Sequence, residues 1–283
     1  MQNEKLRTAS LRIFHFAFLI FNFLVRSDTI LNTRMSVNQE TGISEELRRR
    51  FREARRVFVL TGAGVSAESG VPTFRGGGQT AVWKGMPFDK ISSAGMLERN
   101  LAEVWEWFNY RRDVIESIAP NAAHLAIERW QDRFEDFTLV TQNVDGLHQA
   151  AGSRSCIELH GNLWRARCIW CEAKYDLRNG ETTASPTFTC EDCGNHLRPD
   201  VVLFGEMLPV GAYELAAAKA KDAELCFVVG TSAIVYPAAS LPEIASAAGA
   251  YVVEINPEPT PLSNLCDEVI MGKAGEVLPL FEL

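Results

Sequence analysis

The sequence predicts an α/β protein with a Rossmann-like parallel sheet and a smaller domain made of a helical insertion and a zinc-binding insertion. Three observations support this fold class. Short apolar runs alternate with helical stretches, a glycine-rich turn follows the first run, and two Cys-x-x-Cys pairs interrupt the alternation. A chain of 283 residues exceeds one domain of roughly 150 residues, so a second unit fits its length.

Uninterrupted apolar runs are typical of parallel strands that are covered on both faces. We expect strands at Val57 to Leu60, Phe137 to Val140, Glu224 to Val229 and Tyr251 to Ile255. We expect helices at Asn121 to Gln131, Gly211 to Lys221 and Ala238 to Ala248, and an amphipathic helix over Glu46 to Arg56. This repetition of strand, loop and helix predicts a ligand site at the carboxyl ends of the strands.

Two segments break the alternation. Ala81 to Ile118 carries tryptophans in a helical pattern, and Arg165 to Pro199 is punctuated by cysteines and has few apolar residues. We therefore expect a sheet domain built from residues 36–79, 120–163 and 201–283. The helical insertion, 80–119, and the zinc module, 164–200, are expected to form the small domain.

The first 34 residues differ from the rest of the chain. Ile13 to Val25 is an apolar run of 13 residues, whereas a helix that spans a bilayer needs about 20. No small-residue cleavage pattern follows it, so no stable membrane insertion is expected. We interpret residues 1–34 as an extension outside the native protein or as a presequence, with a membrane anchor as the remaining alternative. The expected location is cytoplasmic, or mitochondrial if the segment is a presequence.

Charge and cysteine content restrict the partners. The formal net charge is −8, so the chain lacks the positive field that binding to a phosphate backbone usually requires. No nucleic-acid partner is expected. Seven cysteines in a chain of this length are too few for a disulfide scaffold and favour reduced thiols and a metal site.

A glycine-rich motif follows the first expected strand. Gly62-x-Gly64-x-x-Ala67 matches the pattern in which small residues let the backbone and a helix N-terminus approach a pyrophosphate. A nicotinamide dehydrogenase would continue to an acidic residue about 20 positions on. This chain instead continues into a glycine-rich loop that carries Phe74 and Arg75. We expect both side chains over the cleft, in an architecture that departs from hydride transfer.

The four cysteines of the expected zinc module are Cys168, Cys171, Cys190 and Cys193. Two such pairs supply four thiolates, which close a tetrahedral zinc site with no open coordination position. The metal is therefore expected to be structural. A nucleic-acid-binding zinc ribbon is the competing interpretation. It is disfavoured because residues 165–200 contain five basic and six acidic side chains.

Polar residues follow the second expected strand. Gln142, Asn143 and Asp145 come directly after it, where side chains can reach a ligand in the crevice. His160 precedes Gly161 after the next short apolar run, and its ordinary pKa near neutrality suits a general base. His124 and His148 are interpreted as structural histidines.

Together these residues resemble the sirtuins, the NAD-dependent protein lysine deacylases. The resemblance runs from about Val57 to the C-terminus. Its further motifs are Gly70-Val71-Pro72-x-Phe74-Arg75, Phe204-Gly205-Glu206, Gly230-Thr231-Ser232 and Ile255-Asn256.

The resemblance implies NAD as co-substrate and one structural zinc per chain. NAD is expected to contact Gly62, Ala63, Gly64, Ser66, Phe74, Arg75, Gln142, Asn143, Asp145, Gly230, Thr231, Ser232, Asn256 and Ala274. His160 is the implied catalytic base, which takes a proton from a ribose hydroxyl. The implied products are free lysine, nicotinamide and O-acyl-ADP-ribose.

The implied partners are acylated-lysine proteins and peptides. A peptide is expected to pair as an added strand along residues 202–206 and 233–236. The residues expected to bind this substrate are Phe108, Arg111, Val202, Phe204, Gly205 and Glu206.

One helix also resembles the branch of the family that removes acidic acyl groups. That branch carries Tyr-x-x-Arg where this chain has Phe108-x-x-Arg111. We expect removal of acetyl groups and also of succinyl or malonyl groups, with a weaker acid preference. Two other classes remain open: a mono-ADP-ribosyltransferase or NAD hydrolase using the same pocket, and a non-catalytic NAD- or zinc-dependent binding module.

Overall fold

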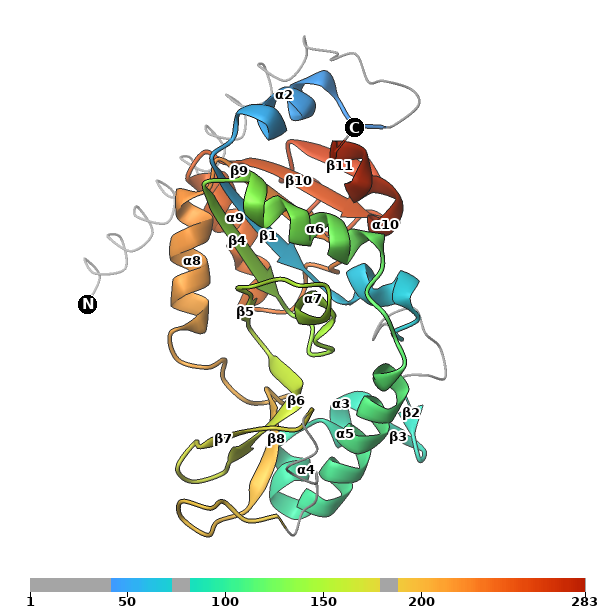
Figure 1. Ribbon diagram of the computed structural model, residues 1–283, viewed down its shortest axis with the longest axis vertical. Helices are drawn as coiled ribbons and strands as arrows, with labels where there is room; N and C mark the ends of the chain where they lie inside the picture. The colour runs from blue at the N-terminus through green and yellow to red at the C-terminus, as the bar shows by residue number, and fades with distance from the viewer. Residues whose placement is uncertain (1–41, 73–81, 179–187, 283) are drawn as a thin grey trace, which may run out of the picture.

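The computed structural model describes residues 42–72, 82–178 and 188–282. Within them, a six-stranded parallel sheet has the order β11-β10-β9-β1-β4-β5. Its strands are β1 (Arg56–Thr61), β4 (Asp136–Thr141), β5 (Ile157–Glu158), β9 (Leu225–Val229), β10 (Tyr251–Asn256) and β11 (Glu268–Met271). The expected strands are confirmed, and the predicted Rossmann-like sheet forms the upper part of the molecule in Figure 1.

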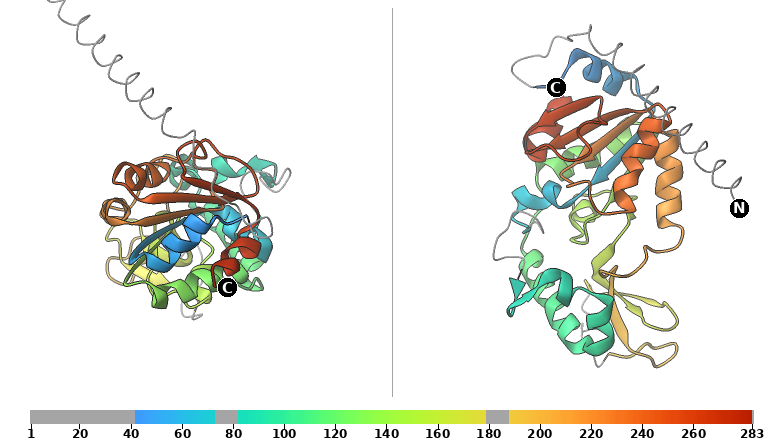
Figure 2. Two further views of the ribbon diagram at one scale, coloured as in Figure 1. Left: turned by 90° about the horizontal axis from the view of Figure 1, so that it is seen from above. Right: turned by 180° about the vertical axis from the view of Figure 1, so that it is seen from behind.

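Helices cover both faces of this sheet. One apolar cluster packs α2 (Glu45–Glu53), α6 (Ala122–Arg133), α10 (Ala274–Val277) and η4 (Leu278–Glu282) on one face. On the other face lie α8 (Ala212–Asp222), η3 (Ala238–Ser240) and α9 (Leu241–Ala247). Figure 2 shows α8 and α9 side by side. The β strands contribute alternate residues to the two clusters, for example Val59 and Leu60 of β1. Two-sided burial explains their unbroken apolar sequence.

The small domain lies below the large sheet in Figure 1. It holds a three-stranded antiparallel sheet in the order β7-β6-β8, made of β6 (Gly161–Cys168), β7 (Lys174–Asp176) and β8 (Leu197–Val201). Beside it are α3 (Phe88–Ile91), α4 (Ala94–Arg99) and α5 (Leu101–Glu116). A short hairpin, β2 (Val82–Trp83) and β3 (Met86–Pro87), precedes them.

One expectation about local structure was wrong in detail. The helical insertion begins with the β2–β3 hairpin, where Lys84 and Gly85 adopt positive φ at the turn. The helix that follows the glycine-rich motif is a seven-residue 3-10 helix, η1 (Ala63–Ser69).

The part of the chain that the structure describes contains no helix long and apolar enough to cross a bilayer. The apolar run Ile13 to Val25 and the loop residues Phe74 and Arg75 lie outside the described residues.

Candidate active site

A cleft of about 1410 Å³ lies between the carboxyl ends of the large sheet and the small domain. Both parts of the molecule line it. The expected site residues along its wall are Gly62, Ala63, Gly64, Phe108, Arg111, Gln142, Asn143, His160, Val202, Phe204, Gly205, Glu206, Gly230, Thr231, Ser232 and Asn256. The structure thus brings most of the expected site residues into one cavity.

The glycines at one end of the cleft let two loops touch. Gly64 N–H donates to the carbonyl of Gly230 at 2.7 Å. A Cβ on Gly64 would lie 2.7 Å from Gly230 Cα, and one on Gly230 would lie 2.4 Å from Val65 N. Any larger residue would push the β1 and β9 loops apart. The missing side chains therefore have a packing role as well as the expected role toward a pyrophosphate.

Ser66 and Asp145 lie behind the cleft wall, buried at 0% and 5% exposure. The Ser66 hydroxyl donates to Asp145 Oδ2 at 2.8 Å and accepts from Asn143 Nδ2 at 3.2 Å. Asn143 Nδ2 also donates to the carbonyl of Gly62 at 3.0 Å. Both residues were expected to contact NAD. In the structure Ser66 bonds to Asn143, which lines the cleft, and Asp145 bonds to Ser66.

His124 completes this network. Its Nδ1 accepts the backbone N–H of Asn121 at the start of α6, so its Nε2 carries the proton and donates to Ser66 Oγ at 3.3 Å. His148 lies beside it, with ring centroids 4.9 Å apart, and its Nε2 contacts Thr61 Oγ1 at 3.0 Å. Burial lowers the pKa of His124 to about 4 and that of His148 to about 3. Both histidines are neutral and structural, as expected.

Asp145 is a buried carboxyl whose pKa is raised. Burial raises it, against the hydrogen bonds from Leu147 N–H and Ser66 and the positive charge of Arg111, all of which stabilise the carboxylate. Arg111 is itself buried at 9% exposure, and burial lowers its pKa, against the attraction of Asp145. Arg111 therefore acts electrostatically on Asp145 and also lines the cleft.

His160 lies where β5 ends and β6 begins. Its Nδ1 contacts the carbonyl oxygen of Gln142 at 2.9 Å. A carbonyl only accepts, so Nδ1 carries the proton and Nε2 has the free lone pair of a base. Burial lowers the pKa of His160, against the backbone hydrogen bond, so the ring is neutral at pH 7. Gly161 has φ +79°, and a Cβ there would lie 2.1 Å from Asp200 O, which explains the His-Gly pair.

A second group of polar side chains forms the far end of the cleft. Gln142 Nε2 donates to Thr231 Oγ1 at 2.9 Å, and Asn256 Nδ2 donates to Thr231 O at 3.2 Å. These bonds tie the ends of β4, β9 and β10 together. Ala274 was expected here, but it is buried at 4% exposure and does not line the cleft.

The two residues that were expected to contact the acyl group lie side by side on one helix. Phe108 and Arg111 both lie on α5, are buried, and line the cleft together with Trp107. The Arg111 guanidinium lies 5.6 Å from the centre of the Trp107 ring. Tyr110 is 49% exposed and does not line the cleft.

The expected peptide-binding segment, residues 202–206, follows β8. Much of its backbone is already bonded within the protein. Val202 N–H donates to His160 O at 2.9 Å, and Phe204 N–H donates to Ser92 O at 2.8 Å. Phe204 O accepts from Ala94 N–H at 3.0 Å. An added peptide strand therefore cannot use the Phe204 N–H while its bond to Ser92 persists.

The four cysteines form the expected cluster, and their sulfur atoms all lie within 4.8 Å of one another. Cys168 and Cys193 sulfurs are 3.4 Å apart, and those of Cys171 and Cys190 are 3.5 Å apart. Zn–S bonds of about 2.3 Å in a tetrahedron place sulfurs about 3.8 Å apart, so the cluster fits a zinc ion. The other cysteines, Cys156, Cys226 and Cys266, form no disulfide.

Several lining residues were not expected from the sequence. An apolar rim continues beyond Glu206, and a proline-rich loop follows β10. The missed residues include Glu68, Trp107, Met207, Leu208, Pro209, Val210, Tyr213, Pro257, Pro259, Thr260, Pro261 and Lys273. The apolar run after Phe204-Gly205-Glu206 was the available signal for the rim.

Comparison with known proteins decides the family. A model described as the Sir2 family matches residues 62–237. The chain belongs to the Sir2 family. It is 50% identical over 241 residues to an NAD-dependent protein deacylase of Thermus thermophilus, covering 83% of this chain and 92% of that protein. It is 47% identical over 226 residues to NAD-dependent protein deacylase 2 of Pyrobaculum aerophilum, covering 80% of this chain and 89% of that protein.

Solved structures of the family share the fold. A Sir2 homologue in complex with NAD has a TM-score of 0.79 and 39% identity, covering 85% of this chain and 93% of that chain. A Sir2 structure with a p53 peptide and NAD⁺ has a TM-score of 0.72 and 31% identity, covering 83% of this chain and 95% of that chain. The predicted fold, the enzyme class of NAD-dependent protein deacylases and NAD as co-substrate are confirmed. The four-cysteine cluster is consistent with structural zinc.

Proposed function

We propose that this sirtuin removes acetyl and acidic acyl groups from protein lysine side chains, with His160 as the catalytic base. The hydrogen bond between His160 Nδ1 and Gln142 O is the observation that carries this proposal. It fixes the tautomer whose Nε2 can take a proton in the cleft, and the lowered pKa keeps that atom unprotonated at neutral pH.

NAD, when bound, supplies an electrophilic ribose carbon by loss of nicotinamide. Around it, the Gly62 to Gly64 turn would take the pyrophosphate, and Thr231, Ser232 and Asn256 the adenosine. Asn143 would face the nicotinamide end. In this arrangement His160 Nε2 would accept a proton from a ribose hydroxyl, the proton transfer that acyl transfer from the lysine nitrogen to that oxygen requires. Asp145, through Ser66, keeps Asn143 in place.

Arg111 underlies the proposed acyl range. A guanidinium buried in the wall of a cleft favours a carboxylate through a charge-assisted hydrogen bond. Phe108 places an aromatic ring where its relatives of the acidic-acyl branch offer a hydroxyl, so one neutral hydrogen bond to that carboxylate is missing. Part of the Arg111 charge also acts on Asp145. Both features reduce the advantage of an acidic acyl group over acetyl.

The direct test compares acetyl-, succinyl- and malonyl-lysine versions of one peptide with NAD. We expect nicotinamide, free lysine peptide and the matching O-acyl-ADP-ribose in equal amounts, for all three peptides. Arg111→Met should lower turnover of the succinyl and malonyl peptides more than that of the acetyl peptide. ADP-ribosylated protein without deacylated peptide would instead indicate a transferase. Nicotinamide release that is independent of peptide would indicate an NAD hydrolase.

A further inference from the structure

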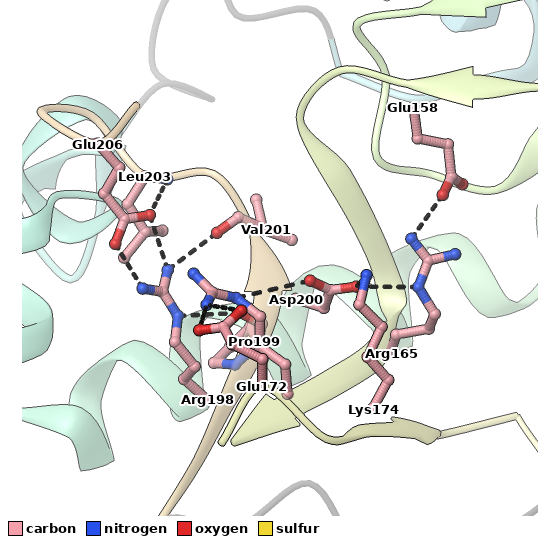
Figure 3. A network of polar contacts seen from close by, with 11 residues as sticks. Glu158, Arg165, Glu172, Lys174, Arg198, Pro199, Asp200, Val201, Leu203 and Glu206 are labelled. Carbon is pink, nitrogen blue, oxygen red and sulfur yellow. Dashed lines mark hydrogen bonds and ion pairs between the residues drawn. The ribbon is translucent and has the colours of Figure 1, made fainter. Parts of the chain in front are cut away.

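The guanidinium of Arg198 on β8 is buried next to the 202–206 segment, with its side chain 5% exposed. All three of its nitrogens donate hydrogen bonds (Figure 3). Nε donates to Pro199 O at 3.3 Å, and Nη2 donates to Val201 O at 2.9 Å. Nη1 and Nη2 together hold both oxygens of Glu206, the second at 2.9 Å. A buried cation is costly unless it is paired in this way.

The Glu206 carboxylate has a second partner within its own loop. Its Oε2 accepts the backbone N–H of Leu203 at 2.8 Å, while Glu206 N–H donates to Leu203 O at 2.9 Å. Burial would raise the pKa of Glu206, but its bonds with Arg198 and Leu203 hold it below its ordinary value. The carboxylate therefore closes the turn from Leu203 to Glu206 while ionised, and Arg198 fastens the closed turn to β8.

Three backbone hydrogen bonds hold the same segment. Val202 is bonded to His160, and Phe204 to Ser92 and to Ala94 at the start of α4. These contacts fix the first part of the segment. Gly205, at φ +90°, lies between them and Glu206, so the second half depends on the Arg198–Glu206 pair. Both halves line the cleft.

We propose that Arg198 and Glu206 are positioning residues, whose buried ion pair holds the 202–206 segment in the shape that receives the acylated peptide. This inference rests on the proposed deacylation. The Glu206 carboxylate points to Arg198 (Figure 3), so we infer that it acts on substrate through the shape of the loop. Loss of the pair should loosen the peptide side of the cleft and leave the NAD end, formed by β1, β9 and β10, intact.

The test measures steady-state constants for one acetyl-lysine peptide and for NAD, with separate anisotropy measurements of peptide binding. Glu206→Gln keeps the shape of the side chain and removes its charge, and Arg198→Lys keeps the charge and removes the two-pronged contact. We expect the peptide KM and Kd to rise roughly tenfold, within the range measured for residues of one hydrogen-bond network. The NAD KM and kcat should each stay within about twofold of wild type.

The matched control is Arg129→Met. Arg129 also makes a two-pronged pair, with Glu282, but neither residue lines the cleft. It should leave both KM values unchanged. The double variant Arg198→Met with Glu206→Leu removes both charges and leaves neither one buried alone. The increase in its peptide Kd, expressed as a free energy, should therefore be smaller than the sum for Arg198→Met and Glu206→Leu measured separately.

Melting curves show which variants are folded at the assay temperature. If Arg198→Met or Arg198→Lys does not fold, Glu206→Gln, confirmed as folded at the assay temperature, decides alone. A Glu206→Gln enzyme with unchanged peptide Kd would overturn the inference, as would equal rises in the peptide and NAD constants. Wild-type protein that releases no deacylated peptide would instead contradict the proposed function, because that result does not depend on either variant.

Discussion

The two parts of this enzyme are stabilised in different ways. In the sheet domain, β9 is buried along its whole length, and two large apolar clusters cover the two faces of the sheet. Around the zinc module, the buried cluster among the described residues comprises Trp105 of α5 with Ala166, Cys168, Cys190 and Leu197. Two of those five residues are cysteines of the proposed metal site. Apolar burial stabilises the first region, whereas we expect the second to depend on its metal.

The ion pairs of the two regions also differ, in how far their side chains are exposed. In the small domain, Asp200 has a side chain only 10% exposed and contacts Arg165 at 3.0 Å, Lys174 at 3.2 Å and Arg167 at 3.6 Å. Arg165 also reaches Glu158 at the edge of the large sheet (Figure 3). The pairs on the sheet domain, such as Arg129 with Glu282, are more exposed. In the zinc module, where the described buried cluster is small, fixed charges contribute to the geometry.

The largest expected effect follows removal of a metal ligand. Cys171→Ser and Cys193→Ser should each abolish zinc binding and disorder the small antiparallel sheet, because structural zinc contributes on the order of 10 kcal/mol to such modules. Elemental analysis and limited proteolysis measure the two effects. Cys266→Ser, which alters a thiol outside the cluster, should retain one zinc per chain. A folded, active Cys171→Ser protein without metal would contradict the comparison.

The next largest effect is on turnover and concerns His160, the proposed catalytic base. His160→Ala should lower acyl-lysine turnover roughly 100-fold or more, the usual effect of losing a general base, while NAD affinity is kept. In the wild type, kcat/KM should fall as pH drops below 6.5 through the lowered pKa of His160. Unchanged turnover in His160→Ala, measured as nicotinamide release, would show that another group acts as base.

A smaller effect concerns acid stability of the sheet domain. In the folded protein, burial lowers the pKa of His124 to about 4 and that of His148 to about 3, from 6.5. Below pH 6.5 the unfolded chain binds protons that the folded one does not. Each histidine should therefore lower stability by up to about 1.4 kcal/mol per pH unit as pH falls from 6.5 toward its folded pKa. Urea melts between pH 4.5 and 7 measure this effect. The unfolding free energy of His148→Gln should fall less steeply with decreasing pH than that of wild type.

The smallest expected effect is on acyl choice. Phe108→Tyr restores one hydrogen bond beside Arg111, which is worth about 0.5–1.5 kcal/mol. The succinyl-to-acetyl ratio of kcat/KM should rise roughly 2- to 12-fold on that basis. Tyr110→Phe, on the exposed side of α5, is the matched control and should leave the ratio alone. An unchanged succinyl-to-acetyl ratio in Phe108→Tyr would show that residue 108 does not contact the acyl group.

The sequence predicted those features that depend on local pattern. Unbroken apolar runs such as Val57 to Leu60 identified the strands, and the cysteine spacing identified the cluster. Polar residues after strands identified His160 and Asn143, because strand order brings those ends to one edge.

Other features depend on contacts between distant segments. Ser66 and Asp145 match a binding motif, yet burial behind Asn143 turns them into supports. Turn formation by Lys84 and Gly85 converts part of the helical insertion into a hairpin. The pairing of Arg198 with Glu206 joins a β8 residue to the Phe204-Gly205-Glu206 motif, and neither position in the sequence indicates the other.

Ligand binding to zinc-stripped protein tests the difference between the two regions most directly. After chelator treatment, calorimetric titrations with NAD and with an acetyl-lysine peptide can be run on the same sample. We predict that NAD binding survives within a few-fold, because the sheet domain keeps its apolar core, and that peptide binding is lost with the small domain. Simultaneous loss of both ligands, or peptide binding that persists without zinc, would contradict this account.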